Sequence, residues 1–164
     1  MYKSGRTFKD QANEEIKDPR FAYIKTCHDL KMLPKAGMVI RSEKTTHLSY
    51  ANFGLLHKSS MAVAESIKRY PLEIEALDFT GNGIRSKECI MIVEALDPHL
   101  GTLSILNFSE NKIGFEGAKA IGEKVLNMKQ LECINVASNM LGDEAIYEIL
   151  KGVSFCQTLK EINF

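Results

Sequence analysis

Residues 103–114 read LSILNFSENKIG, and the spacing of their apolar residues and of their one asparagine recurs elsewhere in the chain. Similar segments, 29 and then 28 residues apart, begin at Ile74, Leu103 and Leu131; a degenerate segment spans 48–55 and another begins at Leu159. Self-similarity at a period of this length predicts a solenoid in which successive copies stack as coils.

Each copy has the features of a strand, a turn and a helix in that order. Apolar and polar residues alternate at its start, which predicts a short strand with its apolar side chains in the core. Asn82, Asn111 and Asn139 can bond the backbone groups of the turn, which stacking would otherwise bury without partners. Apolar residues spaced three and four apart then predict a helix. The pattern LxxLxLxxNxL is typical of leucine-rich repeats, so we expect an α/β fold with parallel strands on a concave face and helices on a convex face.

Three residues allow more specific predictions about the turns and about a helix start. Gly114 and Gly142 follow the last apolar position of their copies and suit a sharp turn with positive φ. Ser86 is a candidate N-cap for the helix of the second copy.

The segments Asn111–Ala118 and Asn139–Ala145 read NKIGFEGA and NMLGDEA. They are similar to the N-x-[IL]-G-x-E-[GA]-A phrase of the ribonuclease-inhibitor type of leucine-rich repeat protein. The resemblance covers residues 47–164, about four and a half coils. It implies a curved stack with a full helix on the outside of each coil.

The residues before the repeats differ in character. Residues 1–17 are polar and without a period that would bury a face, so we expect a flexible tail. Residues 18–46 are expected to form a helical cap over the first coil. Within them the spacing of Tyr23, Cys27, Leu30 and Pro34 is similar to the N-terminal segment of leucine-rich-repeat proteins of cilia, flagella and centrioles. This resemblance implies a structural protein of the microtubule cytoskeleton, with tubulin or axonemal proteins as partners.

Composition bounds the function further. The net charge is zero, but residues 1–69 carry 13 basic against 7 acidic residues, whereas residues 70–164 carry 8 against 14. This asymmetry either orients the chain on a partner or reflects solvated helix faces. The sequence shows no signal peptide and no membrane span, which favours a cytoplasmic protein. The four cysteines have no zinc spacing, and Cys89 falls in a helical column that predicts burial.

The concave face is where such folds usually bind, and alternation along the strands predicts its outward side chains. They are short, polar and mostly uncharged, with a small apolar patch, which suits a protein segment better than phosphate groups. The alternative is a solvated face without a partner. The candidate surface consists of His47, Ser49, Asp78, Thr80, Ile105, Asn107, Ser109, Cys133, Asn135, Glu161 and Asn163.

Catalysis, cofactors and nucleic acid find no support in the sequence. The four histidines are scattered: His28, His47, His57 and His99. The glycine-containing run at 81–87 lacks Walker spacing. A basic stripe with interleaved aromatic residues is missing as well. One regulatory alternative is a GTPase-activating role, which the resemblance to ribonuclease-inhibitor-type solenoids implies, although that family has a longer solenoid and an acidic tail.

The last copy contains a candidate strand, with Leu159, Ile162 and Phe164 at its apolar positions. No asparagine, turn or covering helix follows it in the sequence. A bare terminal strand exposes backbone donors and acceptors, so we expect either a fragment of a longer protein or an edge that a neighbouring repeat protein or a second copy covers.

Overall fold

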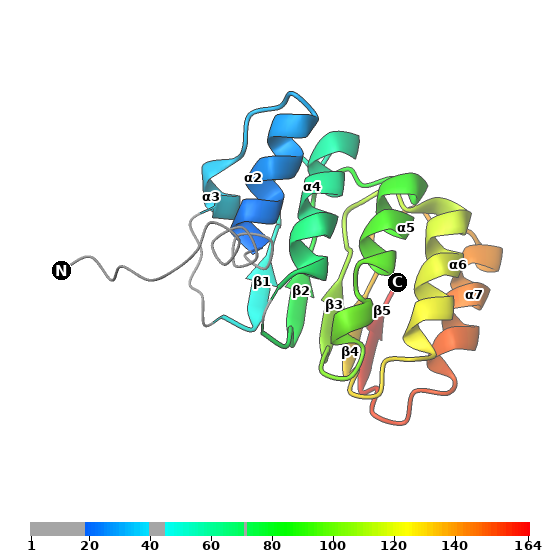
Figure 1. Cartoon of the computed structure of the whole chain (residues 1–164). Coiled ribbons are helices and arrows are strands. Elements are labelled where there is room, and N and C mark those ends of the chain that lie inside the picture. The colour runs from blue at the N-terminus through cyan, green and yellow to red at the C-terminus, as the bar shows by residue number, and fades with distance from the viewer. Residues whose placement is uncertain (1–18, 40–44, 71) are drawn as a thin grey trace.

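The computed structural model describes residues 19–39, 45–70 and 72–164. Its centre is one sheet of five parallel strands whose order in space is their order in the sequence (Figure 1). Each strand pairs with the strand of the next copy, so the α/β architecture expected from the repeat pattern is confirmed. The strands are β1 (His47–Ser49), β2 (Ala76–Asp78), β3 (Ile105–Asn107), β4 (Cys133–Asn135) and β5 (Glu161–Asn163).

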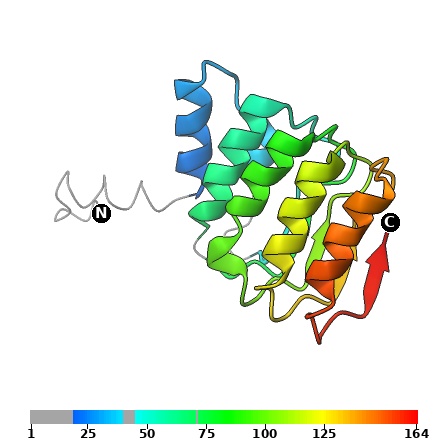
Figure 2. The same ribbon diagram turned by 90° about the vertical axis from the view of Figure 1, so that its right-hand side faces the viewer.

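The described helices all lie on one side of this sheet (Figure 2). One α-helix follows each of the first four strands, and within residues 19–39 two helices precede β1. The helices are α2 (Pro19–Asp29), α3 (Ala36–Val39), α4 (His57–Lys68), α5 (Ser86–Glu94), α6 (Gly114–Val125) and α7 (Asp143–Val153), with a 3-10 helix η1 (Asp97–His99) after α5.

Equivalent apolar residues of successive copies stack on one another in the core. Leu48 pairs with Leu77, and Leu77 pairs with Leu106 across adjacent strands. Each of these side chains is almost fully buried and faces the helices. Because equivalent residues stack directly on one another, the core is continuous along the solenoid axis.

Three aromatic rings form a stack within this core. The ring of Phe79 lies 5.2 Å from that of Tyr50 and 5.0 Å from that of Phe108, with interplanar angles of 4° and 18°. None of the three side chains is more than 3% exposed. The stack joins the first three coils through the residue that follows each strand.

The asparagines of the turns link each coil to the coil before it. The side-chain oxygen of Asn111 accepts hydrogen bonds from the backbone N–H of Asn82 at 3.1 Å and of Ile84 at 3.0 Å. Its amide nitrogen donates to the carbonyl of Phe79 in the preceding coil and to two carbonyls of its own turn. Asn82 and Asn139 bond in the same manner.

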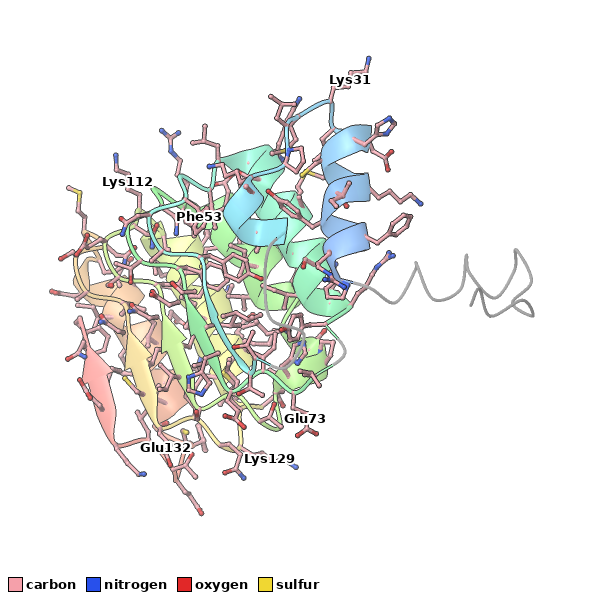
Figure 3. All side chains as sticks on the ribbon, turned by 90° about the vertical axis from the view of Figure 1, so that its left-hand side faces the viewer. Lys31, Phe53, Glu73, Lys112, Lys129 and Glu132 are labelled. Carbon is pink, nitrogen blue, oxygen red and sulfur yellow. The ribbon has the colours of Figure 1, made fainter. Side chains whose placement is uncertain are left out.

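Because each ladder asparagine bonds the coil before it, the first coil has no use for one, and Phe53 stands at that position. An asparagine at that position would have to bond a preceding coil, whereas the preceding segment here is the helical cap. Phe53 instead packs toward Gly37 of α3 (Figure 3), and its carbonyl accepts a hydrogen bond from the Lys35 ammonium.

The cap contacts the first coil through α2, which lies along α4 (Figure 1). Tyr23 and Cys27 are buried against the coil, and the Tyr23 hydroxyl accepts a hydrogen bond from the Lys35 backbone N–H at 3.1 Å. The predicted tail at 1–17, and residues 18 and 40–44 of the predicted cap, lie outside the described residues.

Two expectations about the turns were wrong. Gly114 has a positive φ of 59°, as expected, but Gly142 has φ −81° and is the extended N-cap of α7. Ser86 is the first residue of α5 and not its N-cap; its hydroxyl donates to the carbonyl of Ile113 at 2.8 Å. The N-terminus of α5 is fixed instead by the Glu88 carboxylate, which accepts from the Arg85 backbone N–H at 3.2 Å.

Helices α6 and α7 are in tight contact at two glycines. A Cβ atom at Gly122 would overlap the carbonyl oxygen of Glu148, and one at Gly152 would overlap the carbonyl oxygen of Gly122. We therefore expect Gly122→Ala to lower the free energy of unfolding by about 2–3 kcal/mol, because the helices must move apart. Chemical denaturation measures this, with Gly101→Ala as control, since a Cβ there meets no atom within 4 Å. Equal stability of the two variants would contradict the close approach.

His99 is a buried histidine that joins two coils. Its Nε2 donates to the carbonyl of Ile67 at 3.0 Å, and its Nδ1 accepts from the backbone N–H of Ile74 at 3.4 Å. The side chain is 2% exposed, so it is structural. Burial lowers the pKa of His99, although the hydrogen bond to Ile67 and the charge of Glu73 act in the opposite direction.

This lowered pKa predicts a loss of stability in weak acid. Below the unfolded pKa of about 6.5 the unfolded chain binds a proton that folded His99 does not, so the free energy of unfolding falls as the pH falls. Urea denaturation can be measured from about pH 7.5 to about pH 5, a range that brackets the unfolded pKa of about 6.5. As the pH falls, the free energy of unfolding should decrease more steeply for the wild type than for His99→Gln. Parallel declines would show that His99 does not contribute.

Candidate protein-binding face

The side of the sheet opposite the described helices, here called the strand face, corresponds to the concave face predicted from the sequence. Two of its columns run across the strands. The first consists of His47, Ala76, Ile105, Cys133 and Glu161, and the second of Ser49, Asp78, Asn107, Asn135 and Asn163. All of these side chains are at least partly exposed.

The second column is held in place by the turns that follow the strands. The side-chain oxygen of Asn107 accepts from the backbone N–H of Ser109 at 2.9 Å, and that of Asn135 accepts from the N–H of Ala137 at 3.0 Å. These bonds fix the orientation of both amides. Within the described part of the chain, neither amide nitrogen donates a hydrogen bond to another residue. Two oriented donors on adjacent strands are therefore available to a partner.

Asp78 occupies the same column but is engaged by hydroxyl groups. One carboxylate oxygen accepts from the backbone N–H and the hydroxyl of Thr80, at 3.0 and 2.6 Å, and the other from the hydroxyl of Ser49 at 3.2 Å. The Thr80 hydroxyl also lies 3.2 Å from that of Ser109. Ser109 is only 8% exposed, so its predicted place on the open surface was wrong. Its hydroxyl is instead the buried member of this network.

The first column supplies an apolar patch beside the two amides. The Ile105 side chain is 41% exposed, and Cys133 next to it is partly exposed. Partial burial and the neighbouring Glu161 raise the pKa of the Cys133 thiol, which keeps it uncharged at neutral pH. The patch is thus apolar and small.

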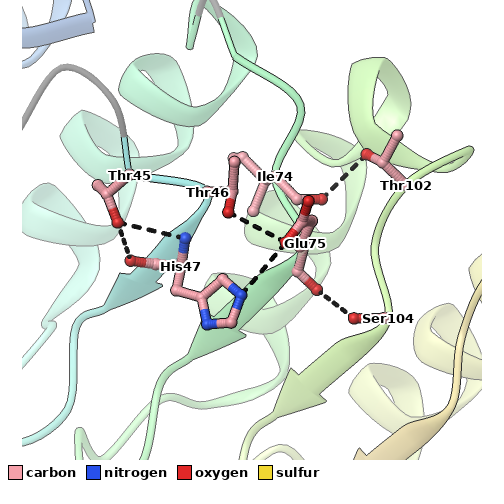
Figure 4. A network of polar contacts seen from close by, with 7 residues as sticks. All are labelled: Thr45, Thr46, His47, Ile74, Glu75, Thr102 and Ser104. Carbon is pink, nitrogen blue, oxygen red and sulfur yellow. Dashed lines mark hydrogen bonds and ion pairs between the residues drawn. The ribbon is translucent and has the colours of Figure 1, made fainter.

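His47 begins the first column and belongs to a polar network at the edge of the sheet (Figure 4). Its Nε2 lies 3.3 Å from a carboxylate oxygen of Glu75, which also accepts from the Thr46 hydroxyl at 3.1 Å. Thr102 and Ser104 of the next coil donate to the carbonyls of Ile74 and Glu75. These bonds connect successive coils, so the network has a structural role.

At the other side of the sheet, β5 pairs with β4, and among the described residues no strand pairs with its outer edge. Leu159 and Ile162 are partly buried against the core, while Phe164 is 44% exposed. Glu161 and Asn163 bond each other at 2.8 Å on the strand face.

Nowhere in 19–39, 45–70 and 72–164 do three or more His, Cys, Asp or Glu side chains gather in a way that could hold a metal ion. Cys89, predicted to be buried, is fully buried, and burial raises the pKa of its thiol. In the same ranges, no helix is long and apolar enough to cross a membrane.

The comparison with known proteins agrees with the repeat geometry. Residues 99–122, which contain β3, Asn111 and the first part of α6, match the family described as Leucine Rich repeat. A search of curated proteins finds no match to the chain. The match supports a leucine-rich repeat protein, and such repeats typically act as protein-binding modules and not as catalysts.

Proposed function

We propose that this protein is a non-enzymatic interaction or scaffold module that binds a protein segment on the strand face. The observation that carries the proposal is the pair of amides at Asn107 and Asn135. Their oxygens are fixed by their own turns, and their nitrogens remain as donors on adjacent strands. A donor fixed in this manner loses little conformational freedom on binding.

The chemistry of the face indicates the kind of partner. Backbone carbonyls of an extended protein segment are acceptors that match the two amides, and an apolar side chain of that segment can contact Ile105. Phosphate groups would require lysine or arginine, which the two columns of the strand face do not contain. A protein partner therefore fits this surface better than a nucleic acid.

A matched pair of substitutions tests the use of this face. Asn135→Lys places a long charged side chain on the strand face, whereas Asn127→Lys makes the same change on the helix side, where Asn127 is exposed. We expect Asn135→Lys to weaken partner recovery in a pull-down by roughly tenfold or more, since a buried unpaired charge costs several kcal/mol. Asn127→Lys should bind like the wild type. If both variants recover the same partners equally well, the strand face is not the binding surface.

The resemblance of the cap extends the proposal to the cytoskeleton. We propose that the partners include tubulin or axonemal proteins of a cilium or flagellum, because the Tyr23, Cys27, Leu30 and Pro34 spacing is similar to that of such proteins. A pull-down from flagellated cells, read by mass spectrometry, tests this placement. Enrichment of axonemal proteins that Asn135→Lys abolishes supports it. Enrichment of a small GTPase whose hydrolysis rate the protein increases would favour the regulatory alternative instead.

Strand addition at β5 is a second contact within the same scaffold role. A further strand, supplied by a neighbouring repeat protein or a second copy, could bond the outer edge of Glu161–Asn163 and cover Phe164. Deletion of residues 157–164 should then reduce assembly, while unchanged assembly would contradict this contact.

A further inference from the structure

The two halves of the described chain carry opposite net charges. Residues 19–39 and 45–69 contain 7 lysines and arginines against 2 acidic residues, a net charge of +5. Residue 70 and residues 72–164 contain 8 basic against 14 acidic residues, a net charge of −6. Because the coils stack in sequence order, α2 lies at the end of the positively charged half, and α7 lies at the far end of the negatively charged half (Figure 1).

The negative end contains a groove with an aromatic centre. It has a volume of about 470 Å³ and lies between α6 and α7 on the helix side of the protein. Its lining consists of Phe115, Asp143, Glu144, Tyr147 and Glu148, with no basic residue. Phe115 is 42% and Tyr147 65% exposed, so both rings present apolar surface to solvent.

The carboxylates of this groove are only partly compensated. Glu148 lies 3.9 Å from the ammonium of Lys151 on the same helix. Asp143 and Glu144 form no ion pair with any residue that the structure describes. Both stand in the first turn of α7, where the helix dipole favours negative charge. The groove therefore combines two exposed rings with carboxylates that no described basic side chain fully neutralises, which is the chemistry that attracts a lysine or arginine.

The positive end has the complementary arrangement on the outer face of α2. Ile24 is 41% exposed and is flanked by the exposed Lys25, and one turn further on His28 lies 3.4 Å from the carboxylate of Asp29. Lys31, just after the helix, points away from the body of the protein (Figure 3). Lys25 and Lys31 form no ion pair within the described residues. Thus an apolar side chain with a basic rim stands at one end, and an aromatic groove with an acidic rim at the other.

We infer that copies of this protein associate head to tail, with the outer face of α2 of one copy docked on the groove between α6 and α7 of the next. Ile24 contacts the two rings, and Lys25 and Lys31 pair with Asp143 and Glu144. The contact is heterologous, because the two surfaces lie at opposite ends of the molecule, so it repeats from copy to copy. It leaves the strand face open and is independent of the partner proposed above.

Paired charge reversals test this contact by sedimentation velocity of the full chain over a concentration series. One variant carries Lys25→Glu and Lys31→Glu, and the other carries Asp143→Lys and Glu144→Lys. Each variant then has like charges on both surfaces, which should weaken self-association at least tenfold (roughly 1.4 kcal/mol). In an equimolar mixture the reversed α2 face of one variant complements the reversed groove of the other, and the two native surfaces complement each other as well, so association should return. The wild type should also dissociate in about 1 M salt, where the Debye length is about 3 Å.

A control variant separates this contact from a general effect of charge. Glu94→Lys and Glu123→Lys make the same change in net charge in the neighbouring groove between α5 and α6. This variant should associate like the wild type, and circular dichroism should show that all variants are folded. A wild type that stays monomeric throughout the series overturns the inference. So does association that survives either reversal, or a mixture that does not associate.

Discussion

Replacing Phe79 by alanine is expected to lower the free energy of unfolding by about 3–5 kcal/mol. The Phe79 ring is fully buried and stacks on Tyr50 on one side and on Phe108 on the other. The substitution removes both ring contacts and leaves a cavity between three coils, which cannot collapse without shifting the strands. For a chain of this size the melting temperature should fall by roughly 10 °C.

Phe155→Ala is the matched control, since the Phe155 side chain is 73% exposed. We expect it to change the free energy of unfolding by less than about 0.5 kcal/mol. Phe79→Leu should fall between the two, because it keeps apolar volume but loses the stacked rings. A cost below about 1 kcal/mol for Phe79→Ala would show that the stack does not stabilise the solenoid.

Asn111→Ala should be nearly as damaging, although it removes no apolar contact. The Asn111 side chain is 4% exposed and forms five hydrogen bonds with backbone groups of its own coil and the preceding coil. Alanine leaves the N–H groups of Asn82 and Ile84 without that acceptor in the core. At about 1–3 kcal/mol for each unsatisfied group, we expect a total loss of roughly 3 kcal/mol or more.

Asn127→Ala serves as the control for this change, because Asn127 is exposed on the helix side. Hydrogen exchange adds a local readout: in Asn111→Ala the amide of Ile84 should exchange faster, since Asn111 is its acceptor. Wild-type exchange at Ile84, together with unchanged stability, would contradict the role assigned to Asn111.

The repeat pattern predicts the architecture well, because the stacking of coils determines both the sequence period and which residues are buried. Each apolar position of a copy must stack on its equivalent in the next copy, so spacing along the chain fixes the strand register. The strands centred on Leu77, Leu106 and Ile134 follow directly from this rule. The positions of the ladder asparagines follow for the same reason.

Other features were not predictable from residue types. Glu110 and Ser138 adopt positive φ values of 57° and 58°, which residues of these types rarely favour. Each precedes a ladder asparagine, so the tertiary hydrogen bonds, and not local preference, hold that conformation. The burial of Ser109 arises from the Asp78 and Thr80 network of the preceding coil. The groove beside Phe115 depends on how two helices pack, which a one-dimensional pattern does not describe.

The strand face is the surface that we propose for binding a partner protein, and site-specific photo-cross-linking tests this proposal most directly. An aliphatic photoreactive residue replaces Ile105, which is exposed on the strand face, or Lys119, which is exposed on α6. The proposal predicts that irradiation in cells yields covalent adducts with another protein from position 105 and few or none from position 119. Adducts from position 119 without adducts from position 105 would contradict it.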